Sequence, residues 1–415
     1  MFKNKNEHYD YVDGGVCSPK GFVANGINCG INSDATKNDL ALIYSEAVCD
    51  TAIVYTQNKV KGAPLIVTKK HMDISKGKSR AIVVNSKNAN TCNANGEEIA
   101  EGVSELVAKY LDIPTEHVVV GSTGVIGKVM KIEPFANHME DLVKGLSSTG
   151  NEEAAKAIMT TDTMKKEVAV EFELNGVTCR IGGMAKGSGM ICPNMATTLS
   201  YITTDIAINQ NLLNDILRDV VKCTINCLSI DGDMSTNDMV VVMANGLAGN
   251  ELITVNDKNC EVFKKALYIV MLYLTRMLAI DGEGASKFLE CSCVGAPDVL
   301  TATKIVKSVV KSSLIKCLLF GQDANWGRIM CAIGYADCEF DINKVKVDIE
   351  SEYGKIDICN GDTIILPFSE EKAAKLLSAK KIYVNIDLCQ GEQEAKAWGC
   401  DLTYDYVKIN GDYRS

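Results

Sequence analysis

The sequence has few prolines, few aromatic residues and no long hydrophobic run. It contains only seven prolines and no proline- or serine-rich stretch, so no linker marks a domain boundary. Its longest apolar run, residues 266–274, is too short to span a bilayer. The opening residues, MFKNKNEHYD, lack the apolar core of a secretory signal. We therefore expect a soluble, cytoplasmic protein without a membrane partner.

Histidine is scarce as well, and cysteine is abundant without being arranged for metal binding. The four histidines lie outside any nucleophile motif and no G-x-S-x-G is present, which argues against a serine or cysteine triad. The 17 cysteines include no C-x-x-C pair, so paired zinc-ligand spacing is absent. We expect most of them to be reduced, buried side chains. The net charge of −10 gives no electrostatic footprint for nucleic acid.

Strand and helix patterns alternate along the whole chain of 415 residues, a length typical of two to three domains. Apolar β-branched runs predict buried strands, and apolar residues at helical spacing predict amphipathic helices. The predicted strands are residues 81–84, 118–120 and 239–243, and the predicted helices are residues 96–111, 212–228 and 261–278. This mixture indicates an α/β or α+β fold of the enzyme type.

The densest unusual stretch, residues 181–205, contains four closely spaced glycines: Gly182, Gly183, Gly187 and Gly189. Their spacing matches neither a P-loop nor a dinucleotide-binding fingerprint, which argues against phosphate binding. From the residues alone, the favoured interpretation is a tight loop that enters a strand.

Three other polar loops allow more than one interpretation. Residues 121–127 (GSTGVIG) follow a predicted strand and form either a plain turn or a source of oxyanion-hole donors. Residues 281–287 end a predicted helix, and Glu283 within them is either a solvated turn residue or a ligand for an ammonium group. The acidic residues around Asp231 do not fit the EF-hand frame, so we interpret them as a polar loop before a strand.

Taken in order, motifs from residue 14 to the last residue resemble the ornithine acetyltransferase/glutamate N-acetyltransferase family of arginine biosynthesis. No single motif is specific for this family, but so many matches in the same order are specific for it. They are GGVCSPKGFVANGINCGI (14–31), VVNSKNAN (83–90), STGVIG (122–127), TTDT (160–163), GMAKGSGMICPNMAT (183–197), SIDGDMSTND (229–238), DGEGASK (281–287), GQDANWGRIMCAIG (321–334) and NGDYRS (410–415).

The resemblance implies self-processing. Proteins of this family cut themselves at an Ala–Thr bond, which corresponds to Ala196–Thr197 here and leaves fragments 1–196 and 197–415. Thr197 then serves as the nucleophile. Its new α-amine has an ordinary pKa of about 7.7–8.0, so it can take the hydroxyl proton without a histidine. The scheme needs no metal and no cofactor.

The resemblance also implies the reaction and the other site residues. Acetyl passes from N2-acetyl-L-ornithine to Thr197 and then to L-glutamate in a ping-pong cycle. Thr123 and Gly124 match the family's oxyanion hole. The positions that match its substrate-binding residues are Thr160, Lys186, Thr197, Glu283, Asn410 and Ser415. We expect Lys186 to meet a substrate carboxylate and Glu283 to meet the ammonium group of ornithine.

The implied architecture is a two-domain, N-terminal-nucleophile-like acetyltransferase fold with its active site between the domains. Its α and β fragments would stay intertwined and assemble as a heterotetramer of two α and two β fragments. Three alternatives stay open. A bifunctional enzyme would also use acetyl-CoA as donor, and the motifs do not separate it from the monofunctional kind. An N-terminal-nucleophile aminopeptidase or amidase would pass the acyl group to water. A non-catalytic relative would be expected to lose Thr197 or the STG loop, and both are intact here.

Overall fold

The computed structural model describes residues 8–192 and 198–413, so the predicted site residues Ala196, Thr197 and Ser415 lie outside the described residues. Within the described part of the chain it has 11 α-helices and two β-sheets, which confirms the predicted α/β class. The chain forms two compact units, each discontinuous in sequence. The first comprises Met1–Gly187, Asn194–Lys222 and Met234–Leu274, and the second comprises Ser188–Pro193, Cys223–Asp233 and Thr275–Ser415.

Each compact unit takes residues from both sides of the bond between residues 196 and 197. The predicted fragments 1–196 and 197–415 are defined by cleavage of that bond and not by compactness. The two fragments therefore stay a prediction, separate from the division into two compact units.

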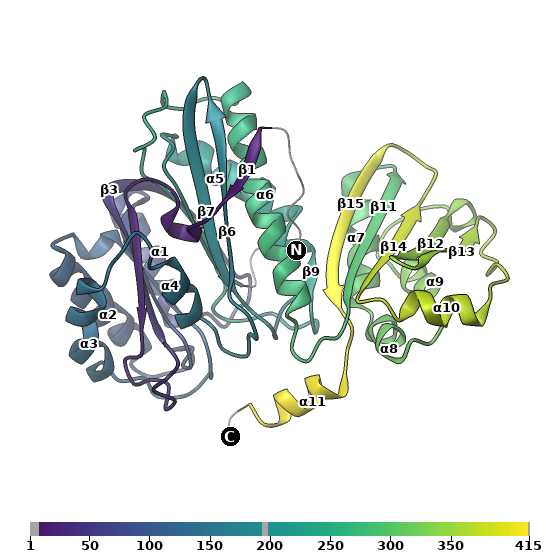
Figure 1. The fold of residues 1–415 in the computed structure, drawn as a ribbon, viewed down its shortest axis with the longest axis horizontal. Coiled ribbons are helices and arrows are strands. Elements are labelled where there is room, and N and C mark those ends of the chain that lie inside the picture. Colours follow the sequence, from purple (N-terminus) through teal and green to yellow (C-terminus); the bar gives the residue numbers. More distant parts are fainter. Residues whose placement is uncertain (1–7, 193–197, 414–415) are drawn as a thin grey trace. The chain divides into compact units, whose positions relative to one another are not determined.

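The first unit is built on a nine-stranded mixed sheet with the order β1-β6-β7-β8-β10-β3-β4-β5, and β2 pairs with β3 outside this path (Figure 1). Its strands are β1 (Tyr9–Val12), β2 (Phe22–Ile27), β3 (Leu40–Tyr55), β4 (Lys78–Asn85), β5 (Val118–Ser122), β6 (Lys166–Leu174), β7 (Val177–Lys186), β8 (Leu199–Thr204) and β10 (Met239–Ala244). β4 and β5 run parallel, as do β8 and β10. Because parallel strands end at the same edge of a sheet, the loops that follow β4 and β5 are neighbours.

The helices of the first unit bury both faces of this sheet. They are α1 (Ala63–Ser75), α2 (Gly96–Leu111), α3 (Glu133–Lys144), α4 (Asn151–Ala157), α5 (Gln210–Lys222) and α6 (Lys258–Ile280), the last as far as Leu274. Along β4, Ala81 and Val83 pack in one hydrophobic cluster with residues of α2 and α3. Ile82 and Val84 pack in another, with residues of α4 and β8. A strand buried on both faces needs a continuous apolar run, which explains the AIVV sequence.

The second unit contains a six-stranded sheet with the order β13-β12-β14-β11-β15-β9. Its strands are β9 (Leu228–Ser229), β11 (Phe288–Ala296), β12 (Lys346–Ser351), β13 (Gly354–Asn360), β14 (Lys381–Asp387) and β15 (Gln393–Cys400). Its helices are α7 (Val299–Lys311), α8 (Ser313–Gly321), α9 (Gly327–Gly334), α10 (Glu370–Leu377) and α11 (Tyr404–Gly411). Helix α7 packs on β11 and β15, and α11 follows β15 directly (Figure 1).

Most of the predicted elements are confirmed. The predicted helix 96–111 is α2 with the same bounds, and the predicted helix 261–278 lies within α6. The three predicted strands lie within β4, β5 and β10.

The predicted helix 212–228 is wrong in its last turns, because α5 ends at Lys222. Its buried face ends at Val221. Beyond it, Ile225–Cys227 form a 3-10 turn, and Leu228 pairs with Trp398 of β15 in the second unit. The apolar residues that continue the helical pattern therefore belong to another core, and periodicity alone cannot detect this change of partner.

The predicted loop at the clustered glycines is also wrong in part. Gly182 and Gly183 lie inside β7, and only Gly187, with φ 149°, begins a loop. A Cβ at Gly182 would lie 1.8 Å from the Gly15 carbonyl oxygen. Glycine is needed there because another backbone segment approaches too closely for a side chain.

Most of the 17 cysteines are buried, as expected, and their reduced state stays a prediction. Burial raises the pKa of the Cys17 and Cys49 thiols to about 12. Such thiols stay protonated and unreactive at neutral pH, so these two cysteines act as small apolar side chains.

Candidate active site

The predicted oxyanion-hole loop begins at the end of β5 and is held by side chains of the neighbouring motifs. Asn85, at the end of β4, pairs with Ser122. The Ser122 hydroxyl donates to Asn85 Oδ1 at 2.6 Å, and the Thr123 amide donates to the Asn85 carbonyl at 2.9 Å. The side-chain amide of Asn237 donates to the carbonyls of Ala89 and Ser122. Asparagine suits these positions because its side chain both donates and accepts.

Thr123 and Gly124 together offer two hydrogen-bond donors to a ligand. Gly124 has φ 130°, and a Cβ there would lie 2.2 Å from the Lys87 carbonyl carbon, so only glycine fits. Among the backbone hydrogen bonds of the described residues outside helices and strands, none is donated by the Gly124 amide. The Thr123 amide is already bonded, but its hydroxyl accepts from Lys186 Nζ at 3.2 Å and keeps its own proton. The available donors are thus the Gly124 amide and the Thr123 hydroxyl.

Lys186 reaches Thr123 because of its place in the sheet. It is the last residue of β7, is only 8% exposed, and pairs with Leu199 at the start of β8. Leu199 follows Thr197 and Thr198 in the sequence. The register of the strands therefore places the predicted carboxylate-binding lysine beside the strand that begins just after the predicted nucleophile.

Asp162, in the TTDT motif, contacts the predicted site residues, although the motifs alone do not single it out. Its carboxylate is fully buried and pairs with Lys166 at 2.6 Å. It also accepts from the amides of Gly187 at 2.8 Å and Thr160 at 3.0 Å. Burial favours the neutral acid, but the charges of Lys166 and Lys186 and these hydrogen bonds hold the pKa of Asp162 well below its usual range. Asp162 is therefore an anion that ties the predicted substrate residue Thr160 to the end of β7.

Asp238, the last residue of the STND motif, is not singled out by the motifs either, and it behaves in the opposite way. Burial raises the pKa of Asp238 to about 8, although Lys186 and hydrogen bonds from Ser235 lower it. Asp238 Oδ2 and the Tyr201 hydroxyl are buried without a hydrogen-bond partner in the described chain. Lys186 thus acts on one acid that stays charged and on another that exchanges its proton near neutral pH, a pattern that is typical of functional sites.

Glu283 of the second unit is a buried carboxylate, so the interpretation as a solvated turn residue is wrong. It is 7% exposed, and its amide donates to the Ser188 carbonyl at 2.9 Å. Gly189 lies against it, since a Cβ there would be 2.2 Å from Glu283 Oε2. Asn410 Nδ2 donates to the same oxygen at 2.7 Å. A buried carboxylate of this kind suits a ligand's ammonium group.

The structure thus brings the described site residues together in two groups, one in each unit. The first group is Thr123, Gly124 and Lys186, with Thr160 joined to it through Asp162. The second group is Glu283 and Asn410. Within the described ranges, no three or more His, Cys, Asp or Glu side chains are placed to hold a metal ion.

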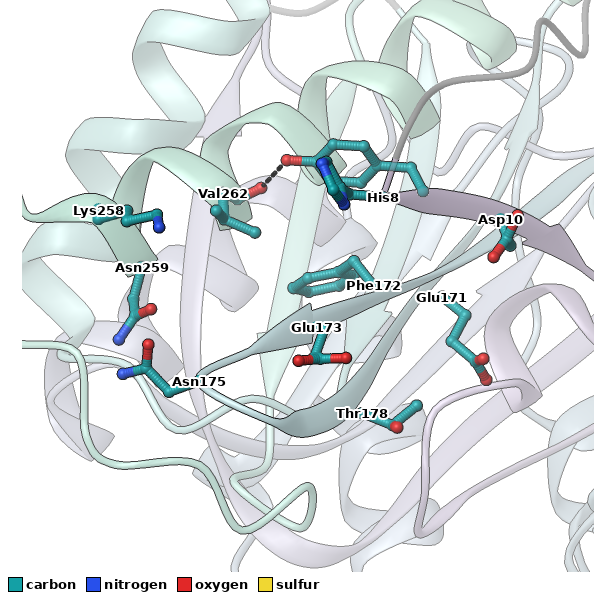
Figure 2. A pocket seen from close by; sticks show the side chains of 11 residues that line it. His8, Asp10, Glu171, Phe172, Glu173, Asn175, Thr178, Lys258, Asn259 and Val262 are labelled. Atoms are coloured by element: carbon teal, nitrogen blue, oxygen red, sulfur yellow. Dashed lines mark hydrogen bonds between the residues drawn. The ribbon is translucent and has the colours of Figure 1, made fainter.

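A surface pocket of about 490 Å³ in the first unit lies elsewhere (Figure 2). Residues of β1, β6 and the start of α6 line it, and the Tyr9 hydroxyl donates to the Val262 carbonyl at 3.1 Å. The acids Asp10, Glu171 and Glu173 border it. No predicted site residue lines this pocket, so it is not the candidate active site.

The comparison with protein families agrees with the motifs. The model of the ArgJ family matches residues 23–415. The chain belongs to the ArgJ family. The arginine biosynthesis bifunctional protein ArgJ of Caldanaerobacter subterraneus subsp. tengcongensis is 44% identical over 407 residues, which are 98% of this chain and 100% of that protein. The arginine biosynthesis bifunctional protein ArgJ 1 of Clostridium acetobutylicum is 46% identical over 395 residues, which are 95% of this chain and 96% of that protein.

Solved structures of ArgJ relatives are similar to parts of the chain. The arginine biosynthesis bifunctional protein of Bacillus halodurans is 42% identical with a TM-score of 0.48, covering 51% of this chain and 97% of that one. An ornithine acetyltransferase from Mycobacterium tuberculosis, complexed with ornithine, is 32% identical with a TM-score of 0.41, covering 45% of this chain and 100% of that one. Among the described residues, no helix is long and apolar enough to cross a membrane.

Proposed function

We propose that this ArgJ family member is a self-cleaving acyltransferase that moves the acetyl group of N2-acetyl-L-ornithine to L-glutamate through acetyl-Thr197. Membership of the family over almost the whole chain supports the proposal, as do relatives named for arginine biosynthesis. The second donor, acetyl-CoA, is supported by the word bifunctional in the relatives' names.

Cleavage at Ala196–Thr197 prepares the nucleophile. The Thr197 hydroxyl attacks the carbonyl carbon of Ala196, the peptide C–N bond breaks, and the proton goes to the departing α-amine. Water then hydrolyses the resulting ester, which leaves a carboxylate on Ala196 and restores the hydroxyl. In each later turnover the free amine takes the hydroxyl proton, so that no histidine is needed.

In acetyl transfer, negative charge develops on the acetyl oxygen when Thr197 attacks. We assign the binding of that oxygen to the Thr123 hydroxyl and the Gly124 amide. The observation that carries this assignment is that both donors are available, beside Lys186, whose strand pairs with the start of β8. Each tetrahedral intermediate would use the same two donors.

Each of the two groups carries a charge that suits one kind of substrate group. Lys186 suits a carboxylate and Glu283 suits the side-chain ammonium of ornithine. Glutamate carries a carboxylate where ornithine carries that cation, so the surroundings of Glu283 must tolerate both. The Asn410 amide helps because it can turn either a donor or an acceptor towards the ligand.

The test supplies the purified enzyme with N2-acetylornithine, labelled in its acetyl group, and with glutamate. Label on glutamate with release of ornithine, lost in Thr197→Ala, is the expected result. Label in free acetate would refute transfer and establish an amidase. Acetylation of glutamate from acetyl-CoA without acetylornithine would establish the second donor.

The expected assembly as a heterotetramer of two α and two β fragments belongs to the same proposal. Native mass measurement of the purified protein tests it, because a single α–β pair would have half the expected mass. The cytoplasmic location stays a prediction from the sequence.

A further inference from the structure

Asp231 is a hydrogen-bond centre that the proposed reaction leaves unused. Its Oδ2 accepts from the Met190 amide at 2.6 Å, and its Oδ1 accepts from the Ile191 amide at 2.9 Å. The Ile230 amide in turn donates to the Ile191 carbonyl at 2.7 Å. All these residues lie in the second unit. One carboxylate therefore fixes two consecutive amides of the segment that precedes the predicted cleavage bond.

The same carboxylate is bonded to helix α11. The hydroxyl of Tyr406 donates to Asp231 Oδ2 at 3.3 Å. Burial, followed by the charge of Asp231, raises the pKa of Tyr406, so the hydroxyl keeps the proton that it donates. The start of α11 is fixed close by, because the Thr403 hydroxyl donates to the Gly284 carbonyl at 2.8 Å and accepts from the Tyr406 amide at 3.3 Å.

Glu283 makes a second link between the same two elements. Its amide donates to the Ser188 carbonyl at 2.9 Å, and its carboxylate accepts from Asn410 in α11 at 2.7 Å. Tyr406 and Asn410 are four residues apart, so they lie on one face of the helix. Residues 188–191 are thus joined to one face of α11 through two acids, Asp231 and Glu283.

We propose that Asp231 is a positioning residue for self-cleavage, which couples the docking of α11 to the conformation of residues 190–191. The bond at 196–197 is then cut efficiently only in chains whose α11 is docked. This inference rests on the proposed function and deepens it, since it assigns a control on the maturation of the same site.

The coupling has a clear advantage. Helix α11 carries Asn410, which contacts the substrate-binding carboxylate. A chain that cut itself before α11 docked would lose its covalent link while its substrate pocket was incomplete. Asp231 takes no part in bond making, because its oxygens are already occupied by amides and a hydroxyl.

The test measures the rate at which the full-length precursor, made by cell-free synthesis, is converted into two fragments. Asp231→Asn removes the charge and one acceptor oxygen, and Tyr406→Phe removes only the hydroxyl. Tyr404→Phe is the control, because Tyr404 lies on the same helix and is 83% exposed. We expect cleavage to slow about 10–100-fold in Asp231→Asn and about 3–10-fold in Tyr406→Phe. The control should cleave at the wild-type rate.

The double variant distinguishes positioning from a general loss of stability. If the hydroxyl acts through Asp231, adding Tyr406→Phe to Asp231→Asn slows cleavage no further, whereas independent effects multiply. Multiplying effects, or wild-type rates in both single variants, would overturn the proposal. If Asp231→Asn fails to fold, the cleavage rate of Tyr406→Phe is compared with that of the control Tyr404→Phe. Equal rates in these two variants would overturn the proposal. A wild type that never cleaves refutes the proposed function itself, because then every chain, the control included, stays whole.

Discussion

The two groups of site residues differ in charge and in how the chain holds them. The group in the first unit lies at strand ends, and its cation, Lys186, is placed by the pairing of β7 with β8. The group in the second unit centres on an anion, Glu283, in a loop that a short helix from much later in the chain holds in place. A sheet ladder fixes its residues through many backbone bonds, whereas a loop depends on a few side-chain contacts.

This difference suggests a division of labour. In the proposed mechanism the first group offers the donors that a developing negative charge needs, in a loop that hydrogen bonds to Asn85 tie to the end of β4. In the same proposal, Glu283 and Asn410 accept two substrates of different charge, so some freedom there is useful. Substitutions in the first unit should therefore change the rate for both substrates alike, and substitutions in the second should change the preference between them.

The largest effect is expected from removing the Thr123 hydroxyl. Thr123→Val should lower kcat/KM about 100–1000-fold for acetylornithine and glutamate alike, because one of the two oxyanion donors is lost. Steady-state kinetics of each half-reaction measure this. Thr123→Ser keeps the hydroxyl and should stay within about tenfold of the wild type. A Thr123→Val enzyme as active as Thr123→Ser would show that the hydroxyl binds no reacting oxygen.

A smaller and selective effect is expected at Glu283. Glu283→Gln removes the charge but keeps an oxygen that can accept from Asn410. The kcat/KM for acetylornithine should fall about 10–100-fold, as for loss of a charged hydrogen bond, and that for glutamate should change far less. The half-reactions can be followed separately by release of ornithine and by acetylation of glutamate. Equal losses for both substrates would contradict the assignment of Glu283 to the ammonium group.

An effect on stability, and none on the preference between substrates, is expected in the pH dependence at Asp238. Its pKa of about 8 means that the folded chain holds this proton more tightly than the unfolded chain, where the pKa is about 3.9. The contribution of the group to stability is complete below pH 4 and is lost as the pH rises towards 8, by at most about 1.4 kcal/mol per pH unit. The Tm of Asp238→Asn relative to that of the wild type should therefore rise from pH 5 to pH 8. A constant difference, measured by thermal unfolding, would show that Asp238 is not neutral when buried.

The sequence predicts the parts of the fold that depend on local pattern. The helix at residues 96–111 and the AIVV strand follow from periodicity, because each buries its apolar residues where the pattern places them. Two predictions are wrong for another reason. They are the C-terminal end of the helix at residues 212–228 and the loop at Gly182. Both depend on which distant segment packs there, β15 in one case and the backbone of Gly15 in the other.

The same limit applies to the site. Thr123, Lys186 and Glu283 are recognisable from motifs, although the motifs do not reveal that Glu283 is buried. Asp162 and Asp238 lie within the TTDT and SIDGDMSTND motifs, so these motifs could have identified them as candidate site residues. Their importance depends on burial and on a shared neighbour, Lys186, which only the fold provides.

The central claim is that Thr197 becomes an N-terminal nucleophile, and the intact mass of the purified protein tests it most directly. The wild type should give two fragments, residues 1–196 and 197–415, and Thr197→Ala should stay whole at 44.9 kDa. A wild type that remains a single chain of that mass would contradict the account, because Thr197 would then never gain the amine that activates it.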